Sequence, residues 1–225
     1  MSSADLLPYE IKISKTEQKV PVVEGVHLHS IYNPDREAEG FVAKHLDSIK
    51  DNSKVLILGL GFGYHVNHIV QKLKQLYGTA FEVCVIEPNR QVYNDCLSLN
   101  NLNLSENISV HCFDHVDSFY RELGIVNFLK EKPVVLMHPA SYNLYQNFFR
   151  EFLTYKAPRD IRHILDSISN PEVKSYLNSY SSALTLDHVL DQLKNETPII
   201  DNPVEFALLA FNEIGSLSTC EESHE

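Results

Sequence analysis

The sequence has no tryptophan, only two methionines and only eight glycines among its 225 residues. It has no apolar run that approaches the roughly 20 residues of a membrane-spanning helix, so we expect no membrane partner. The N-terminus has no basic segment followed by an apolar core, which excludes a typical secretion signal. These absences favour a cytoplasmic protein.

Cysteine and positive charge are also sparse. None of the four cysteines forms a C-x-x-C pair, which excludes a zinc ribbon and a thioredoxin motif. The chain has 19 lysines and arginines against 30 aspartates and glutamates, a formal net charge of -11, and no basic cluster. Because such a chain repels a phosphate backbone, we expect no nucleic-acid partner. The remaining composition is that of an ordinary globular protein.

Short apolar runs alternate with segments of helical periodicity from residue 54 onward. The segment between residues 66 and 73, for example, repeats apolar side chains at helical spacing. Four apolar runs are predicted as strands, at 54–58, 81–86, 108–112 and 133–137. Buried strands separated by helices are typical of parallel sheets. The sequence therefore predicts an α/β fold with a Rossmann-like, doubly wound, mostly parallel sheet.

The segments that flank this pattern differ from it. Residues 1–33 alternate like short strands and are predicted to form a small N-terminal β appendage. A helix should begin near Asn33 and Pro34, and residues 34–157 form the predicted nucleotide-binding core. Residues 158–225 show only helical patterns, so we expect a helical C-terminal extension.

A glycine-rich loop directly follows the first predicted strand of the core. Gly59, Gly61 and Gly63 leave room for a tight turn, and Tyr64 then opens a helix whose free amides could face an anion. The G-x-G-x-G spacing departs from the dinucleotide fingerprint and is closer to the first motif of methyltransferases that use S-adenosylmethionine. We predict a nucleotide-like ligand here, although the glycines could also serve only to make a turn.

Two acidic residues follow the next two predicted strands. Glu87 could accept hydrogen bonds from ribose hydroxyls, and Asp114 could reach the edge of a base. Both have a structural alternative. Glu87 could cap the helix that begins near Asn89, and Asp114 could cap a helix ahead of Val116.

The histidines are numerous but poorly spaced for a metal. His27 and His29 share one predicted strand face, and His65 and His68 share one helix face, but neither pair has a third ligand in sequence. We therefore predict no dedicated metal residues, although Mg²⁺ could accompany a bound nucleotide. His138 follows the fourth core strand and could act as a general acid or base near neutral pH, or be a satisfied histidine at a strand end.

The order of two motifs resembles a known family. S-x-Y-N-P-x-x-E-A at 30–38 precedes G-x-G-x-G-Y-H at 59–65, and together they resemble the flagellar motility accessory factors, whose relatives include archaeal 6-hydroxymethylpterin diphosphokinases. The resemblance covers about residues 10–155. It implies a Rossmann-like core and a role in glycosylating flagellin with nonulosonic acids from CMP-sugars. Flagellin or other glycosylation proteins are then the implied partners.

The first of these motifs contains further candidate ligand residues. If its helix packs beside the glycine loop, Tyr32, Arg36 and Glu37 could complete the pocket, with Arg36 as a phosphate partner. The alternative is local helix capping with a surface ion pair.

Three functions remain open from the sequence. The first is a transferase that uses a nucleotide-activated donor. The second is an S-adenosylmethionine-dependent methyltransferase, although Ile57 stands where that motif usually has an acidic residue. The third is a non-catalytic nucleotide-binding or assembly module.

Overall fold

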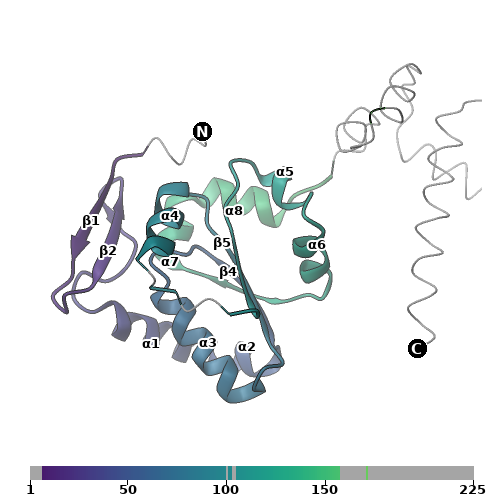
Figure 1. Cartoon of the computed structure of the whole chain (residues 1–225), viewed down its shortest axis with the longest axis horizontal. Coiled ribbons are helices and arrows are strands. Elements are labelled where there is room, and N and C mark those ends of the chain that lie inside the picture. The colour runs from purple at the N-terminus through teal and green to yellow at the C-terminus, as the bar shows by residue number, and fades with distance from the viewer. Residues whose placement is uncertain (1–6, 100, 103–104, 158–170, 172–225) are drawn as a thin grey trace, which may run out of the picture. The chain divides into compact units, whose positions relative to one another are not determined.

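The computed structural model describes residues 7–99, 101–102, 105–157 and 171. The chain forms two compact units, Met1–Tyr155 and Lys156–Glu225. The predicted helical extension at 158–225 lies outside the described residues, except for Pro171. The first unit contains both sheets (Figure 1).

A small antiparallel sheet opens the first unit, as the alternating pattern predicted. Its strands are β1 (Tyr9–Ile13), β2 (Lys19–Val23) and β3 (Val26–His27), in the order β1-β2-β3. The β2 strand buries Val20, Val22 and Val23, so this sheet packs against the rest of the unit. The β3 strand lies against α7 (Pro139–Leu144). This contact brings His29, which lies two residues after the end of β3, toward the main sheet.

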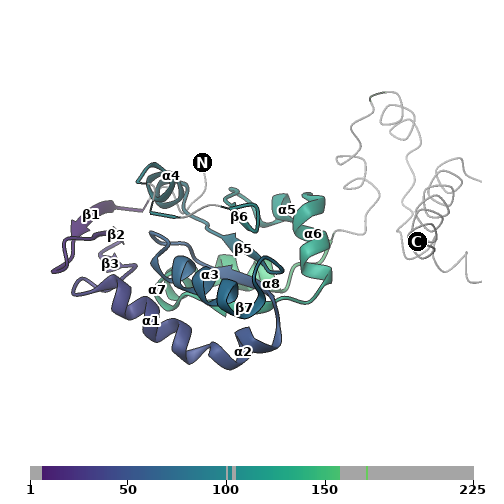
Figure 2. The same cartoon turned by 60° about the horizontal axis from the view of Figure 1, so that its bottom comes forward.

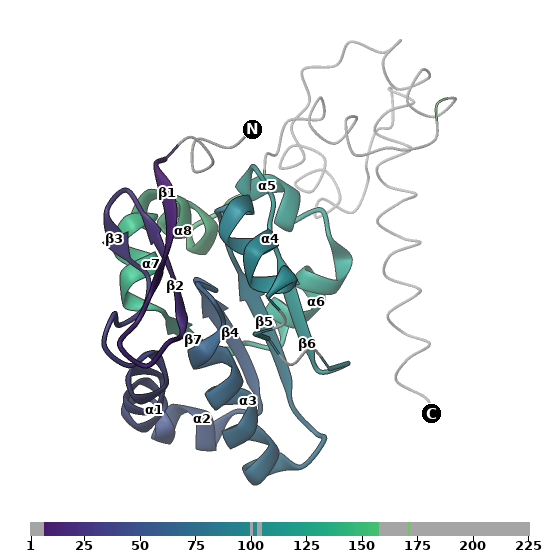
Figure 3. The ribbon, with the colours of Figure 1, turned by 60° about the vertical axis from the view of Figure 1, so that its left-hand side comes forward.

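The main sheet has four strands, all parallel, which confirms the predicted fold class. They are β4 (Lys54–Leu58), β5 (Glu82–Ile86), β6 (Ile108–His111) and β7 (Val134–Met137). Their order is β6-β5-β4-β7 (Figure 3). The chain therefore moves from β4 outward to β6 and then returns to the opposite side of β4. This reversal makes the carboxyl ends of β4 and β7 the topological switch point of the sheet.

Seven further helices accompany α7 in the described part of the chain. The first covers residues that the Asn33-Pro34 start predicted, and Asn33 caps it by accepting the Arg36 amide. Three helical stretches are each divided in two, at His45, at residues 120–122 and at Tyr145, whose backbone leaves the helical region (φ -111°, ψ 34°). The bounds are α1 (Pro34–Lys44), α2 (Leu46–Asp51), α3 (Tyr64–Tyr77), α4 (Arg90–Ser98), α5 (Val116–Phe119), α6 (Leu123–Lys130) and α8 (Gln146–Leu153).

The core lies on both faces of the main sheet, because successive strand side chains point to opposite faces. On one face, Val55 and Ile57 pack in a cluster with apolar residues of α1 and α3. On the other face, Leu56 and Leu58 pack with aromatic side chains, including Phe119 of α5 and residues of α8. Figure 2 shows α1, α2 and α3 together on one side of the sheet. These layers hold the carboxyl ends of the strands in fixed positions.

Candidate functional site

The glycine loop between β4 and α3 is shaped by the protein's own side chains. Gly59, Gly61 and Gly63 all have positive φ, at 99°, 50° and 77°. A Cβ atom on Gly59 would overlap the side chain of Ser141, and one on Gly61 would overlap the imidazole of His29. The glycines are therefore required for close internal packing, whatever else the loop does.

The amides of this loop are bonded inside the protein. Leu60 N donates to Glu87 Oε2 at 2.8 Å, and Phe62 N donates to His29 Nε2 at 2.9 Å. The Gly61 amide also favours the ionised form of Glu87 and lowers the pKa of its carboxyl group. These amides were predicted to face a phosphate, but in this structure their hydrogens point to protein acceptors.

Glu87 is completely buried beneath the loop. Its second oxygen, Oε1, accepts the amide of Asn89 at 3.0 Å, whereas the side chain that caps α4 is that of Asn89 itself and not that of Glu87. Burial raises the pKa of Glu87 to about 7, and the backbone amides of Asn89, Leu60 and Gly61 limit that rise. The carboxylate that was expected to hold a ribose is thus sealed from solvent and used to organise the loop.

Asp114 and Tyr64 also have partners within the protein. Asp114 Oδ1 lies 2.9 Å from Arg90 Nη2 at the start of α4, and this bond lowers the pKa of Asp114. The Tyr64 hydroxyl donates to the carbonyl of Lys19 at 2.8 Å, which ties α3 to β2. The structure therefore shows internal contacts where base and ligand contacts were predicted for these two residues.

The S-x-Y-N-P-x-x-E-A element places its members in different surroundings. Tyr32 is 62% exposed, and its ring lies under the Lys15 ammonium at 4.4 Å from the ring centroid. Arg36 is also exposed. Neither lines either of the two pockets described below, whereas Glu37 lines one of them.

Three buried histidines meet at the switch point. They are His29 after β3, His65 in the first turn of α3 and His138 directly after β7, and each is at least 96% buried. The His65 and His138 rings are stacked, with centroids 4.3 Å apart and an interplanar angle of 6°. The His29 ring lies 4.9 Å from that of His138. One ring nitrogen from each histidine lies within 4.8 Å of the other two.

Hydrogen bonds define the proton positions on two of these rings. His65 Nε2 lies 3.0 Å from the carbonyl of Gly59, so Nε2 carries the hydrogen and Nδ1 has a bare lone pair. That Nδ1 atom is buried and has no hydrogen-bond partner. His29 accepts the Phe62 amide at Nε2, so its hydrogen is on Nδ1, 3.7 Å from Glu37 Oε2. His138 Nδ1 bonds to Ser141 Oγ at 2.8 Å, which leaves Nε2 for other contacts.

Burial keeps the three imidazoles neutral. It lowers the pKa of His65 to about 3, with a further lowering from His29. Burial and the two neighbouring histidines hold the pKa of His138 well below its usual 6.5, and burial also lowers that of His29. The expectation that His138 titrates near neutral pH is therefore wrong. A neutral imidazole can accept a proton or bind a metal, but it cannot serve as an imidazolium acid.

A pocket of about 320 Å³ is lined by this histidine cluster. Its other lining residues include Glu37, Phe41 and Lys44 of α1, and Pro139 at the start of α7. The pocket thus lies at the carboxyl ends of β4 and β7, where open α/β sheets bind ligands. Its volume is at the lower end of the range for small-molecule sites.

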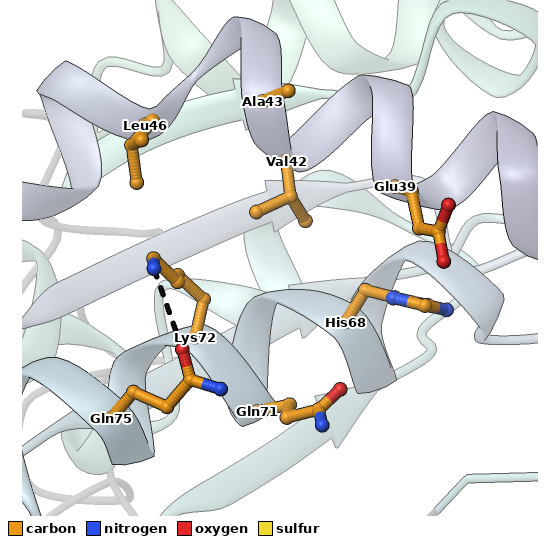
Figure 4. A pocket seen from close by; sticks show the side chains of 8 residues that line it. All are labelled: Glu39, Val42, Ala43, Leu46, His68, Gln71, Lys72 and Gln75. Carbon is orange, nitrogen blue, oxygen red and sulfur yellow. Dashed lines mark hydrogen bonds between the residues drawn. The ribbon is translucent and has the colours of Figure 1, made fainter.

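A second hollow, of about 310 Å³, lies between α1 and α3 (Figure 4). Its lining mixes Val42 and Leu46 with polar residues of α3, and Lys72 donates to Gln75 within it. The α3 residues here extend as far as Gln75, near the end of the helix and away from the glycine loop. No described cluster of possible metal ligands lies in this hollow. The switch-point pocket is therefore the better candidate site.

The fold and the pocket define a Rossmann-like α/β protein with a candidate small-molecule site at the switch point of its sheet. No protein-family model matches the chain, and no curated protein matches it. Among solved structures, the chain is similar to MnmC2 from Aquifex aeolicus, with 17% identity and a TM-score of 0.36. The match covers 56% of this chain and 57% of the other, so this chain spans less than two thirds of that structure. No functional conclusion follows from so distant a likeness.

Across the described ranges, no helix has both the length and the apolar character needed to cross a bilayer.

The histidine cluster was not predicted from the sequence, because each histidine was compared only with histidines close to it along the chain. In the structure, His29 and His65 belong to two different sequence pairs, and both lie beside His138. One signal was available. His65 and His138 follow strands that were both predicted to be parallel, and the ends of adjacent parallel strands meet at one edge. Nothing local in the sequence indicated that His29 would join them.

Proposed function

We propose that this chain binds a nucleotide-type small molecule in the switch-point pocket. The observation that carries the proposal is the position of the pocket, beside the carboxyl ends of β4 and β7. The lining offers an aromatic ring at Phe41, hydrogen-bonding groups at the three histidines and one carboxylate at Glu37. Few polar groups placed in a partly apolar pocket are typical of small-molecule sites.

The resemblance to motility accessory factors supports the nucleotide assignment. Two motifs carry that resemblance, and each contributes a residue to this pocket. Glu37 comes from S-x-Y-N-P-x-x-E-A, and His65 comes from G-x-G-x-G-Y-H. Residues of motifs that are about thirty positions apart thus line a single site. We therefore propose a CMP-type nucleotide sugar as the ligand, and a transferase or accessory role in flagellin glycosylation as the function.

Phosphate recognition in this pocket would differ from that of a phosphate-binding loop. The glycine-loop amides are bonded to Glu87 and His29, so they are not available to a phosphate in this arrangement. Lys44, at the end of α1, is a cation in the lining of the pocket. We expect its ammonium group to contact the phosphate of the ligand as a point charge.

The nucleotide-sugar and methyltransferase alternatives both drew on free loop amides and on a Glu87 carboxylate that could reach a ribose, and both groups are bonded internally. The residue that separates the two alternatives is Ile57, which stands where the methyltransferase motif usually has an acidic residue. S-adenosylmethionine therefore serves as the comparison ligand in a binding experiment. If a CMP-sugar binds but is not turned over, the third alternative, a non-catalytic module, is favoured.

Calorimetry on the full chain tests this proposal. CMP and a CMP-activated sugar should bind, whereas S-adenosylmethionine should not. Replacing Lys44 by Ala should weaken CMP binding about tenfold, the effect of losing one charged hydrogen bond. The matched control is Lys72→Ala, which removes a lysine that lines the other hollow and should leave the affinity unchanged.

Three outcomes would overturn the proposal. They are binding of S-adenosylmethionine with indifference to CMP, no binding of either nucleotide at millimolar concentration, and CMP binding that Lys44→Ala and Lys72→Ala weaken equally. If CMP-type ligands do bind, release of CMP from a CMP-sugar in the presence of flagellin separates a transferase from an accessory protein.

A further inference from the structure

We propose that His29, His65 and His138 form a binding site for a transition-metal ion of the zinc class at the switch-point pocket. The inference does not depend on nucleotide binding, because it concerns the protein and the metal alone. It rests on the convergence of three ring nitrogens, on an unpartnered buried lone pair and on the contacts of the opposite ring nitrogens.

The first observation is the convergence of the three histidines. They come from three parts of the chain that are far apart in sequence, and one nitrogen of each lies within 4.8 Å of the other two. Zinc binds imidazole nitrogen at about 2.0–2.1 Å, which places tetrahedral ligands about 3.4 Å apart. Because the His65 and His138 rings are stacked in parallel planes, they must tilt out of the stack before both lone pairs can point at one ion.

The second observation is the lone pair on His65 Nδ1. This atom is buried and has no hydrogen-bond partner, while the opposite nitrogen donates to the Gly59 carbonyl. A buried acceptor without a partner costs about 1–3 kcal/mol. A metal ion at Nδ1 would remove that cost and would leave Nε2 as the nitrogen that donates to Gly59.

The third observation concerns the nitrogens that would not face the metal. His65 Nε2 bonds to the Gly59 carbonyl, and His138 Nδ1 bonds to Ser141 Oγ. His29 Nδ1 faces the Glu37 carboxylate at 3.7 Å. Metal-binding histidines usually have such a partner on the opposite nitrogen, because it orients the ring and selects the tautomer.

His29 differs from the other two histidines in one respect. Its Nε2 atom already accepts the Phe62 amide, so a metal would take the place of that hydrogen. We therefore expect His29 to contribute less to metal affinity than His65 and His138 do.

The ligand set indicates which ions would bind. Neutral imidazoles suit zinc, cobalt, nickel and copper, whereas Mg²⁺ and Ca²⁺ prefer oxygen ligands. Three protein ligands leave a fourth position open, and here that position would face the pocket. A water molecule or an oxygen of a pocket ligand could occupy it.

Cobalt titration of the full chain tests the proposal. After treatment with EDTA, the protein should bind one Co²⁺ per chain with a visible spectrum typical of four- or five-coordinate cobalt, and Zn²⁺ should displace it. His65→Ala and His138→Ala should each weaken binding at least about 100-fold, and His29→Ala less. His68→Ala and His27→Ala are the matched controls and should bind like the wild type, since neither belongs to the cluster.

A second measurement avoids the risk that a core variant fails to fold. X-ray absorption of the zinc-loaded wild type should show three imidazole ligands. The proposal is overturned if the wild type binds no cobalt, if the control variants lose binding as much as His65→Ala does, or if absorption shows no imidazole ligands. Because no nucleotide is present, metal binding can succeed while the CMP proposal fails, and the reverse also holds.

Discussion

At the carboxyl edge of the main sheet, the two sides of strand β4 differ in whether their buried polar groups have hydrogen-bond partners. On the β5 side, the glycine loop and Glu87 satisfy each other's hydrogen bonds, and Glu87 is fully buried. On the β7 side, His65 and His138 line a pocket, and one buried nitrogen has no partner. Groups that satisfy each other stabilise the fold, whereas an unsatisfied group beside a pocket calls for an explanation. A glycine-rich loop is therefore not by itself a ligand site.

The largest expected effect is on the packed side. Gly59→Ala should destabilise the protein by about 3–5 kcal/mol, because it adds backbone strain at positive φ and overlaps Ser141. Urea unfolding measures this. Gly78→Ala is the matched control, since Gly78 also has positive φ but no atom near its Cβ position, and it should cost about 1 kcal/mol. Equal losses in the two variants would mean that the loop is not packed as described.

The second prediction concerns the carboxylate under the loop. Glu87→Ala should cost about 2–4 kcal/mol, because it leaves the amides of Leu60 and Asn89 buried without acceptors. Asp114→Ala should change the urea midpoint little, since Asp114 forms a surface pair with Arg90. If Glu87→Ala instead kept wild-type stability and lost nucleotide affinity, the carboxylate would be a ligand contact and the comparison would fail.

The third prediction uses pH to separate the two sides. The pKa of buried His65 is lowered from 6.5 to about 3, so below pH 6.5 the unfolded chain binds a proton that the folded chain does not. In the metal-free protein this contribution decreases stability by about 1.4 kcal/mol per pH unit on acidification. Glu87 acts oppositely. Its pKa is raised from 4.5 to about 7, so its contribution increases stability as the pH falls through that interval.

Glu87→Gln removes the opposing carboxyl contribution and makes this prediction measurable. Urea midpoints between pH 7 and pH 4.5 should decrease more steeply for Glu87→Gln than for the wild type. If the urea midpoints of the two proteins changed equally with pH, the pKa of Glu87 would not be raised in the folded protein, and the prediction would be wrong.

The smallest expected effects are at the exposed residues of the first motif. Tyr32→Ala and Arg36→Ala should each change stability by less than about 0.5 kcal/mol, because both side chains are exposed. Neither should alter cobalt or CMP affinity, since neither lines the pocket. A loss of CMP affinity in Arg36→Ala would extend the site beyond the pocket and restore the predicted phosphate role of this residue.

Much of the fold was predictable because it depends on patterns within short segments. Apolar runs predicted the four parallel strands to within one residue at either end, and the Asn33-Pro34 pair predicted the start of α1. The glycines marked the turn after β4 for the same reason, since a positive φ is a local requirement. His138 was placed correctly at the end of the fourth strand.

Which polar groups satisfy one another was decided only by the tertiary structure. The partner of Leu60 is 27 residues away, and the partner of Phe62 is 33 residues away in the opposite direction along the chain. The sequence by itself determined the succession of strands and helices along the chain, the tight turn after β4, and the types of residue at the carboxyl edge of the sheet. Only the packing of β3 against α7 and the pairing of β4 with β7 determined that the loop amides are used internally and that three histidines meet. The physical reason is that a hydrogen-bonding group is satisfied by whatever lies next to it in space, and spatial proximity between distant segments is a property of the folded chain.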